Sequence, residues 1–346
     1  MEQIILNNKQ QSIIAIASLE AKGDIDNLSI AINEGMENGL TVNQIKELLS
    51  QLYAYTGFPR SLNALSVLQK VIEERKNTGK TIEEGNNNSP LPENFNALKE
   101  GTKVQTMLCG GVPFNYSFCP KEDFYLKAHL FGDIFSGDIL TFAERELATI
   151  SALSSIEGLA SQLEAHVKGA RNMGVSDEEI HNIPVVLSQK TGEQEAWRTK
   201  EAIAKVYKSP LTEQKPMTGM SFPQGMPNTT YAKYFIGNSY LQPLVGGKVP
   251  VSNVTFEPGC RNNWHIHHNC RQILICVGGE GWYQEWGKPA QKLKSGDVVN
   301  IPVDVKHWHG ATKDSWFQHV VLHADEGPNP TNEWLEPVDD KHYLSL

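Results

Sequence analysis

Two short motifs in the C-terminal third, each framed by glycine, constrain the fold of this chain more than any other feature. In chain order they comprise Gly259, His265, His267, Gln272 and Gly279, then Gly296, Pro302, Asp304 and His307. Side chains two residues apart on a β-strand point to the same face, so His265 and His267 can direct both imidazoles toward one interior point. An isolated His-x-His pair is more often a packed polar pair, but the two spaced frames favour metal binding. The pattern predicts a small β-barrel with a metal site inside it.

Both motifs resemble those of the cupin superfamily, in which two histidines, a Glu or Gln and a later histidine bind one metal inside a double-stranded β-helix. By this resemblance the ligands are His265, His267, Gln272 and His307. Imidazole nitrogens and an amide oxygen suit a borderline divalent ion. The expected cofactor is therefore one divalent metal ion, namely zinc, manganese, nickel or iron.

The ligand position at 272 carries Gln where a carboxylate is more usual in cupins. Four neutral ligands leave the charge of the ion uncompensated, which strengthens its pull on a bound carbonyl or water. Lewis-acid chemistry is therefore favoured over oxygen activation. His309 would share the inward face of His307 and could act as a pocket acid or base, or instead be a rim histidine bonded to a backbone carbonyl. His319 and His323 could each lie on either face of their strand.

Composition limits the class of protein. A chain of 346 residues with 40% hydrophobic content is long enough for two or three domains. The formal net charge of −9 disfavours a nucleic-acid partner. No apolar run approaches the roughly 18 residues that cross a bilayer, and Glu2 stands where a signal peptide would be basic. We therefore expect no membrane partner.

Cysteine usage fits a reducing compartment, because the number of cysteines is five and none forms a Cys-x-x-Cys pair. Cys109 and Cys119 could approach each other across a loop as a redox-active pair. We expect a cytoplasmic protein that acts on a small-molecule substrate.

The first two hundred residues, roughly, are predicted to be helical and contain an internal repeat. At an offset of 135 residues, segment 38–41 recurs as 173–176, and Leu52, Thr56 and Gly57 recur as Leu187, Thr191 and Gly192. Thr41 and Ser176 are expected helix N-caps, with Gln44 and Glu179 as capping-box partners. Two copies of one helical unit are therefore present.

Polar, turn-rich segments divide the chain. We expect a first helical repeat over residues 1–75, a linker over 76–114, a second repeat over 115–208, a proline-rich linker over 209–228 and a cupin domain over 229–346. The predicted fold class is thus multidomain α + β, an all-α tandem repeat followed by an all-β barrel.

The helical half resembles a tandem carboxymuconolactone decarboxylase domain, also called alkylhydroperoxidase D-like. The resemblance rests on segments 53–64, 131–136, 145–147 and 162–166. In that family the residues matching Glu146 and His166 handle protons, which suits a decarboxylation with a double-bond shift. In the first copy the equivalent of Glu146 is Gln11 or Ser12 and that of His166 is Ala31, so only the second copy could be chemically competent. The alternative for Glu146 is an exposed first-turn acid favoured by the helix dipole.

Helix geometry alone does not predict that Glu146 and His166 meet. With a helical turn near residues 157–160, Glu146 and His166 would be offset by about 7 Å along the helix axes, so other packing must bring them together. The peroxidase branch of the family uses a Cys-x-x-Cys just before its histidine, and segment 158–162 contains no cysteine. Thiol peroxidase activity is therefore not expected, because it requires a thiolate nucleophile.

The expected function is a metal-dependent lyase or isomerase acting on a small oxygenated carbon acid, a lactone or a sugar acid. Its catalytic residues would be Glu146, His166 and His309. One alternative is a non-catalytic, metal-dependent small-molecule binding or scaffold protein, and another is an iron-dependent cupin oxygenase. A homo-oligomer is expected, because helical units of this family resemble parts of ring-like oligomers and cupins commonly pair.

Overall fold

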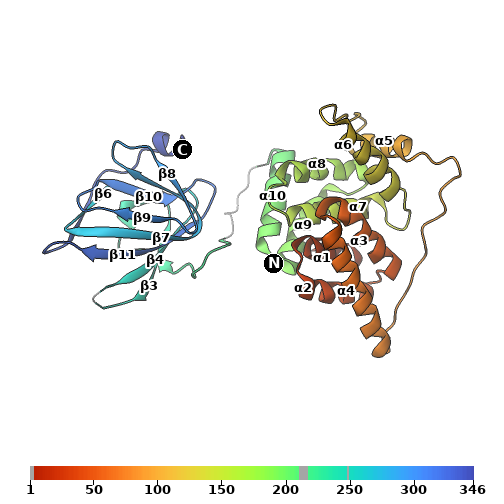
Figure 1. Cartoon of the computed structure of the whole chain (residues 1–346), viewed down its shortest axis with the longest axis horizontal. Coiled ribbons are helices and arrows are strands. Elements are labelled where there is room, and N and C mark those ends of the chain that lie inside the picture. Colours follow the sequence, from red (N-terminus) through yellow and green to blue (C-terminus); the bar gives the residue numbers. More distant parts are fainter. Residues whose placement is uncertain (1–3, 210–216, 248) are drawn as a thin grey trace. The chain divides into compact units, whose positions relative to one another are not determined.

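The computed structural model describes residues 4–209, 217–247 and 249–346 (Figure 1). The chain divides into two compact units, Met1–Thr212 and Glu213–Leu346. The first is helical and the second is an antiparallel sheet that curls into a barrel. The predicted fold class is confirmed. Part of the predicted linker, residues 210–216, lies outside the described residues.

The two helical repeats are visible as two sets of four α-helices. They are α1 Asn8–Lys22, α2 Ile25–Glu37, α3 Val42–Thr56 and α4 Phe58–Asn77, then α7 Phe142–Ser154, α8 Ala160–Ala170, α9 Asp177–Lys190 and α10 Glu193–Tyr207, with a 3₁₀ turn η2 at Arg171–Met173. Thr41 and Ser176 begin α3 and α9 with the predicted capping boxes. Equivalent local signals therefore produce equivalent helices in the two copies.

The repeats share one hydrophobic core. Helix α1 packs against α7, α3 against α7, and α1 against α9. Ile14, Leu48, Ile150 and Ile183 are fully buried in the same cluster. Because each repeat buries its apolar stripe against the other, the two copies form a single folded unit.

The segment between the repeats is more structured than predicted. Residues 76–114, expected as a linker, contain helix α5 at Ala97–Leu108, which packs against the π-helix η1 at Tyr125–Ile134 after the short α6 at Pro120–Phe124. The buried positions of α5 are Gly101, Gln105 and Leu108. Ala97, Val104 and Leu108 recur at helical spacing, and Val104 and Leu108 pack in one cluster, so the sequence does carry a helical period here. The predicted linker therefore contains this helix.

The C-terminal unit is built from antiparallel strands. They are β1 Met226–Pro227, β2 Phe235–Ile236, β3 Ser239–Val245, β4 Val251–Phe256, β5 Arg261–Asn262, β6 His265–His268, β7 Cys270–Glu285, β8 Gln291–Lys294, β9 Val298–Ile301, β10 His307–Ala311, β11 Phe317–Asp325 and β12 Thr331–Trp334, with the short helices η3 Ala232–Tyr234 and α11 Asp340–Leu344.

Strand β7 holds the barrel together. Its first half pairs with β11 and β9, and its second half pairs with β10 and β8. This single long strand thus belongs to both halves of the curled sheet, which enclose the buried Phe256, Leu274 and Phe317 (Figure 1). Among the described residues, no helix is long and apolar enough to span a bilayer.

Candidate metal centre and acid–base pair

The barrel brings three of the predicted ligands together. His265 and His267 lie on β6, and His307 begins β10, where it pairs directly with His265. Each of the three histidines has one ring nitrogen within 4.8 Å of those of the others. All three are buried. The strand alternation that the sequence indicates therefore produces a convergent set of imidazoles.

The turn before His307 helps to place it. Asp304 adopts a left-handed backbone with φ 61°, a conformation that Asp tolerates better than most residues. Its backbone N–H donates to the carbonyl of His267 at 2.9 Å. The second motif is thereby fixed to the strand that carries the first.

In two of the predicted ligands, His265 and His307, hydrogen bonds to the backbone fix which ring nitrogen is available to a metal ion. The Nδ1–H of His265 donates to the Asn263 carbonyl at 2.9 Å, and the Nδ1–H of His307 donates to the Val305 carbonyl at 2.9 Å. Since a carbonyl can only accept, Nε2 of each ring retains its lone pair. Nε2 of His267 is buried and has no hydrogen-bond partner in the described part of the chain. These lone pairs fit a metal ion, and the carbonyl contacts are the outer contacts that metal-binding histidines usually have.

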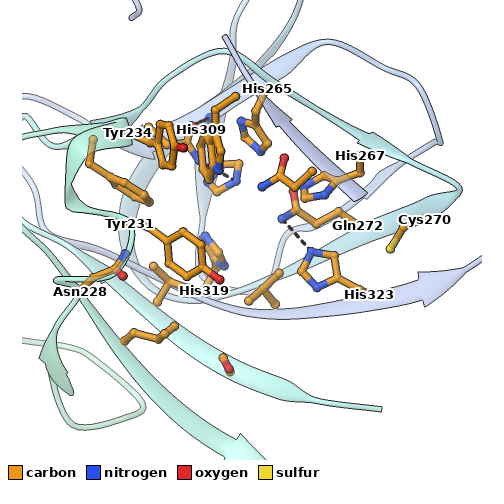
Figure 2. Close-up of a pocket in the computed structure, with 18 of the residues that line it drawn as sticks. Asn228, Tyr231, Tyr234, His265, His267, Cys270, Gln272, His309, His319 and His323 are labelled. Carbon is orange, nitrogen blue, oxygen red and sulfur yellow. Dashed lines mark hydrogen bonds between the residues drawn. The ribbon is translucent and has the colours of Figure 1, made fainter. Parts of the chain in front are cut away.

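Gln272 lies beside this group on β7. Its Oε1 is 3.1 Å from Nε2 of His307, and its Nε2 is 3.4 Å from Nε2 of His323 (Figure 2). Nε2 of His307 and Oε1 of Gln272 each offer a lone pair, so they cannot hydrogen-bond to each other at 3.1 Å. Both could bind one cation placed between them. The fourth predicted ligand is therefore in reach of the site.

Burial keeps these imidazoles neutral. Removal from water, together with the neighbouring imidazoles, places the pKa of His265 well below its usual value. The same causes lower the pKa of His267 to about 3, and burial lowers that of His307 to about 4. Neutral imidazole is the form that binds metals, so the site is ready to bind a cation at neutral pH.

A cavity of about 600 Å³ adjoins the histidines. Figure 2 shows His265, His267 and Gln272 along one part of its wall and the phenol of Tyr231 in another part. The rings of Tyr234 and Trp334, which also line it, stack at 4.6 Å. The volume and the largely aromatic wall are typical of a site for a small organic molecule.

His309 and His319 line the same cavity (Figure 2). The Asn262 amide clamps His309, because its Oδ1 accepts from the His309 backbone N–H at 2.9 Å and its Nδ2 lies 3.1 Å from Nε2 of the ring. The His319 ring lies 4.9 Å from that of His309. Neither nitrogen of His319 has a hydrogen-bond partner among the residues described. The ring nitrogens of His319 are therefore more available to accept a proton than those of His309, which lie beside the Asn262 amide.

The sequence left the orientation of His319 open, and the structure explains why. The register between β11 and β7 shifts between Gln318 and His319. This irregularity interrupts the alternation of buried and exposed residues, and five consecutive positions from Phe317 to Val321 are buried. A period of two cannot assign a face in such a strand.

The helical unit brings Glu146 and His166 into contact. Nδ1 of His166 is 2.8 Å from Oε2 of Glu146, and the Glu146 side chain is fully buried. The alternative of an exposed first-turn acid does not fit this burial. The connection between α7 and α8 covers residues 155–159, so the axial offset is smaller than predicted, about 3 Å.

The cysteines take no part in either group. Cys109 is exposed and Cys119 half-buried, and both are free thiols in the structure. Partial burial raises the pKa of Cys109, which disfavours the reactive thiolate. No described cysteine belongs to the metal-binding group.

Comparison with known proteins defines the class of each unit. Residues 5–70 and 125–202 match the carboxymuconolactone decarboxylase family, and residues 252–321 match the cupin domain. The helical unit is therefore a carboxymuconolactone decarboxylase family domain, and the barrel is a cupin domain.

One curated relative and two solved structures illustrate the similarity. The chain is 34% identical over 116 residues to the (R)-mandelonitrile lyase of Granulicella tundricola, a match that covers 32% of this chain and 87% of that protein. A cupin-like protein from Thermotoga maritima is 40% identical, with a TM-score of 0.33, 36% of this chain covered and 95% of the other. A predicted oxalate decarboxylase from the same organism is 18% identical, with a TM-score of 0.27, 30% of this chain covered and 94% of the other.

Proposed function

We propose that the barrel is a metal-dependent lyase acting on a small oxygenated carbon compound, one that presents a hydroxyl, carbonyl or carboxylate oxygen. The observation that carries the proposal is the convergence of His265, His267 and His307, the first two of which line a cavity large enough for such a molecule. The relative named a mandelonitrile lyase supports the class of reaction.

The four proposed ligands, with Gln272 as the fourth, are all uncharged at neutral pH. A divalent ion held by them would act as a Lewis acid that polarises a substrate oxygen and stabilises negative charge there. Their role is to bind that ion while adding no negative charge of their own. The Gln272 amide in particular replaces a carboxylate that would offset the charge of the ion.

His319 is the proposed general base, and His309 a second proton-handling group. Burial lowers the pKa of His319 to about 3, so its ring is neutral at pH 7 but weakly basic, and it would take the proton of a substrate hydroxyl whose acidity a bound metal ion had raised. In a lyase step the electrons of the O–H bond would form a C=O bond as the bond to the neighbouring carbon breaks, and the leaving group would depart with the electron pair of that bond and receive the proton. Asn262 holds the His309 ring in place beside it.

The cavity wall indicates which substrates to test. The aromatic surface of Tyr231, Tyr234 and Trp334 suits an apolar or aromatic substituent, while the histidines suit an oxygen-bearing carbon. Mandelonitrile, which combines a phenyl ring with a hydroxyl-bearing carbon, is therefore the first probe. Small lactones and sugar acids complete the panel.

The test combines metal analysis with turnover. The purified protein is expected to contain close to one zinc, manganese, nickel or iron ion per chain, and to release benzaldehyde from mandelonitrile, measured by its absorbance. His265→Ala should remove both metal and turnover, whereas His319→Gln should keep the metal and lose turnover by on the order of 10²-fold or more. His268→Ala is the matched control, because His268 is on the same strand but hydrogen-bonds to Asp304 and Glu333 on the surface.

The possible outcomes separate the competing functions. Bound metal without turnover of any panel member would favour the binding or scaffold function. Iron with substrate-dependent oxygen uptake would favour an oxygenase. Full turnover by metal-free protein would refute the proposal.

The helical unit supports a second candidate function, a proton-transfer step of its own. The favouring observation is the buried carboxylate–imidazole pair of Glu146 and His166, in which Oε1 of Glu146 has no hydrogen-bond partner among the described residues. A carboxylate that orients and stabilises a histidine is a common arrangement for general acid–base catalysis. Such a pair could serve a lyase or isomerase reaction of a small lactone or carbon acid.

A further inference from the structure

We propose that the acid–base site of the helical unit is composite: Tyr55 of the first repeat is a third catalytic group beside Glu146 and His166 of the second, and donates a hydrogen bond to the oxygen of a small carbonyl compound or lactone. The inference rests on the proton-transfer function proposed above for the Glu146–His166 pair.

Tyr55 points at the pair from helix α3. Its ring meets that of His166 edge-on, with centroids 5.7 Å apart and planes at 80°. The Tyr55 hydroxyl is buried and has no hydrogen-bond partner in the described chain, and the same holds for Oε1 of Glu146. Two buried oxygens without partners beside one histidine are costly unless a ligand satisfies them.

The protonation state of Tyr55 suits a donor. Burial and the nearby Glu146 carboxylate raise the pKa of the phenol well above its usual value, so it keeps its proton at all physiological pH values. The neighbouring Thr149 hydroxyl donates to the Arg145 carbonyl and accepts from Nε2 of Gln51, which leaves one lone pair near the phenol. No hydrogen bond joins the two hydroxyls in the described chain, so a ligand oxygen would compete with Thr149 alone for the phenolic proton.

A buried network fixes α3 onto α7. Nε2 of Gln51 donates to the Arg145 carbonyl at 3.0 Å, and Nη1 of Arg145 donates to Oε1 of Gln51 at 2.9 Å. Nη2 of Arg145 also pairs with Glu47 at 2.6 Å. Tyr55 lies one helical turn beyond Gln51, so it is held at a defined position over α7.

The repeat provides an independent argument. At the offset of 135, the counterpart of Tyr55 is Lys190 and that of His166 is Ala31. The counterpart of Glu146 is Gln11, or Ser12 at an offset of 134. Lys190, Gln11, Ser12 and Ala31 all line one cavity of about 340 Å³. The packing of the repeats thus brings an equivalent set of three positions together twice, each set with two positions from one repeat and one from the other. Only the set that contains Glu146 and His166 has an acid–base pair.

The chemistry that this arrangement supports is a double-bond shift. His166 would take a proton from the carbon next to a carbonyl, and the electrons of that C–H bond would form an enolate whose oxygen accepts the Tyr55 hydrogen bond. Return of the proton from His166 to the other end of the conjugated system gives the isomer, with no net oxidation or reduction. Glu146 stabilises the transient imidazolium through its contact with Nδ1.

The test uses α-angelica lactone, a β,γ-unsaturated lactone whose conversion to the conjugated isomer needs only this proton shift. The full-length protein is incubated with the lactone in buffered D₂O, and isomer formation and deuterium incorporation are followed by proton NMR. Tyr55→Phe should lower the rate by on the order of 10²-fold, the usual cost of losing one donor to a developing oxyanion. The matched control is Tyr53→Phe, since Tyr53 lies on the same helix but stacks on Phe58.

Each outcome has a distinct meaning. If His166→Gln abolishes the shift and Tyr55→Phe reduces it while Tyr53→Phe does not, both proposals hold. If His166→Gln abolishes the shift but Tyr55→Phe retains the wild-type rate, the role of Tyr55 is refuted and the pair stands. A wild-type rate no higher than that of His166→Gln overturns the proton-transfer function and the Tyr55 role with it. Unchanged melting of Tyr55→Phe, with unchanged metal content, excludes misfolding as the cause of a loss.

Discussion

Glu20 is predicted to make the stability of the helical unit depend on pH. This α1 residue is 1% exposed, and burial raises its pKa from 4.5 to about 7. The Thr56 hydroxyl donates to Oε1 at 2.8 Å and the Arg60 charge also favours ionisation, but Oε2 is buried without a hydrogen-bond partner among the described residues. The ionised carboxylate is therefore poorly accommodated.

The sign and size of the effect follow from proton linkage. Because the folded-state pKa is raised, the folded protein binds more protons than the unfolded chain between pH 4.5 and 7, so stability falls as pH rises through this window. At about 1.4 kcal/mol per pKa unit, the shift corresponds to a loss on the order of 3 kcal/mol above pH 7. Replacement of Glu20 by Gln removes the charge and keeps an acceptor for Thr56, so it should recover most of this loss.

The assay is thermal and urea unfolding of the full chain, followed by far-ultraviolet circular dichroism, which reports mainly on the helical unit. At pH 8, Glu20→Gln should unfold at a temperature higher by about 6–12 °C, given roughly 2–4 °C per kcal/mol for a unit of this size. At pH 4.5 the two proteins should differ little. An exposed acid in the same unit, Glu73, is the matched control, and Glu73→Gln should show no comparable dependence on pH. An equal difference between wild type and Glu20→Gln at both pH values would refute the reasoning.

Three further predictions concern the barrel and the helical packing. Gln272→Glu adds a negative charge beside the other ligands, so we expect tighter metal binding by titration but lower turnover, because the charge of the ion is offset. Since the pKa values of His267 and His307 are about 3 and 4, metal affinity should hardly change between pH 8 and 6, and a steep loss over this range would contradict the neutral site. In Gly101→Ala the new Cβ would lie 1.7 Å from the Lys127 carbonyl oxygen, so urea unfolding should show a loss of about 1–3 kcal/mol, whereas unchanged stability would contradict the close helix packing.

The sequence predicted what local patterns encode. The repeat, the capping boxes at Thr41 and Ser176 and the order of an all-α part before an all-β part are local or periodic features, and the structure contains them. The spacing of His265 and His267 likewise places both rings on one face through strand geometry alone. Helix α5 was not predicted because it follows a polar, turn-rich segment, although Val104 and Leu108 recur on its apolar face at helical spacing.

The remaining site residues depend on contacts between distant segments. The inward position of His319 follows from a register shift between two paired strands, which no alternation of residues reports. The meeting of Tyr55 with His166 depends on how one repeat packs on the other.

The sequence by itself thus determined the two families, the helical repeat and the identity of the candidate metal ligands, because each depends on short-range spacing. Only the tertiary structure decided which nitrogens are available, which histidine faces the cavity without partners, and which residue of the first repeat lies at the acid–base pair of the second. These depend on burial and on hydrogen bonds between segments far apart in the chain, for which a linear pattern carries no signal.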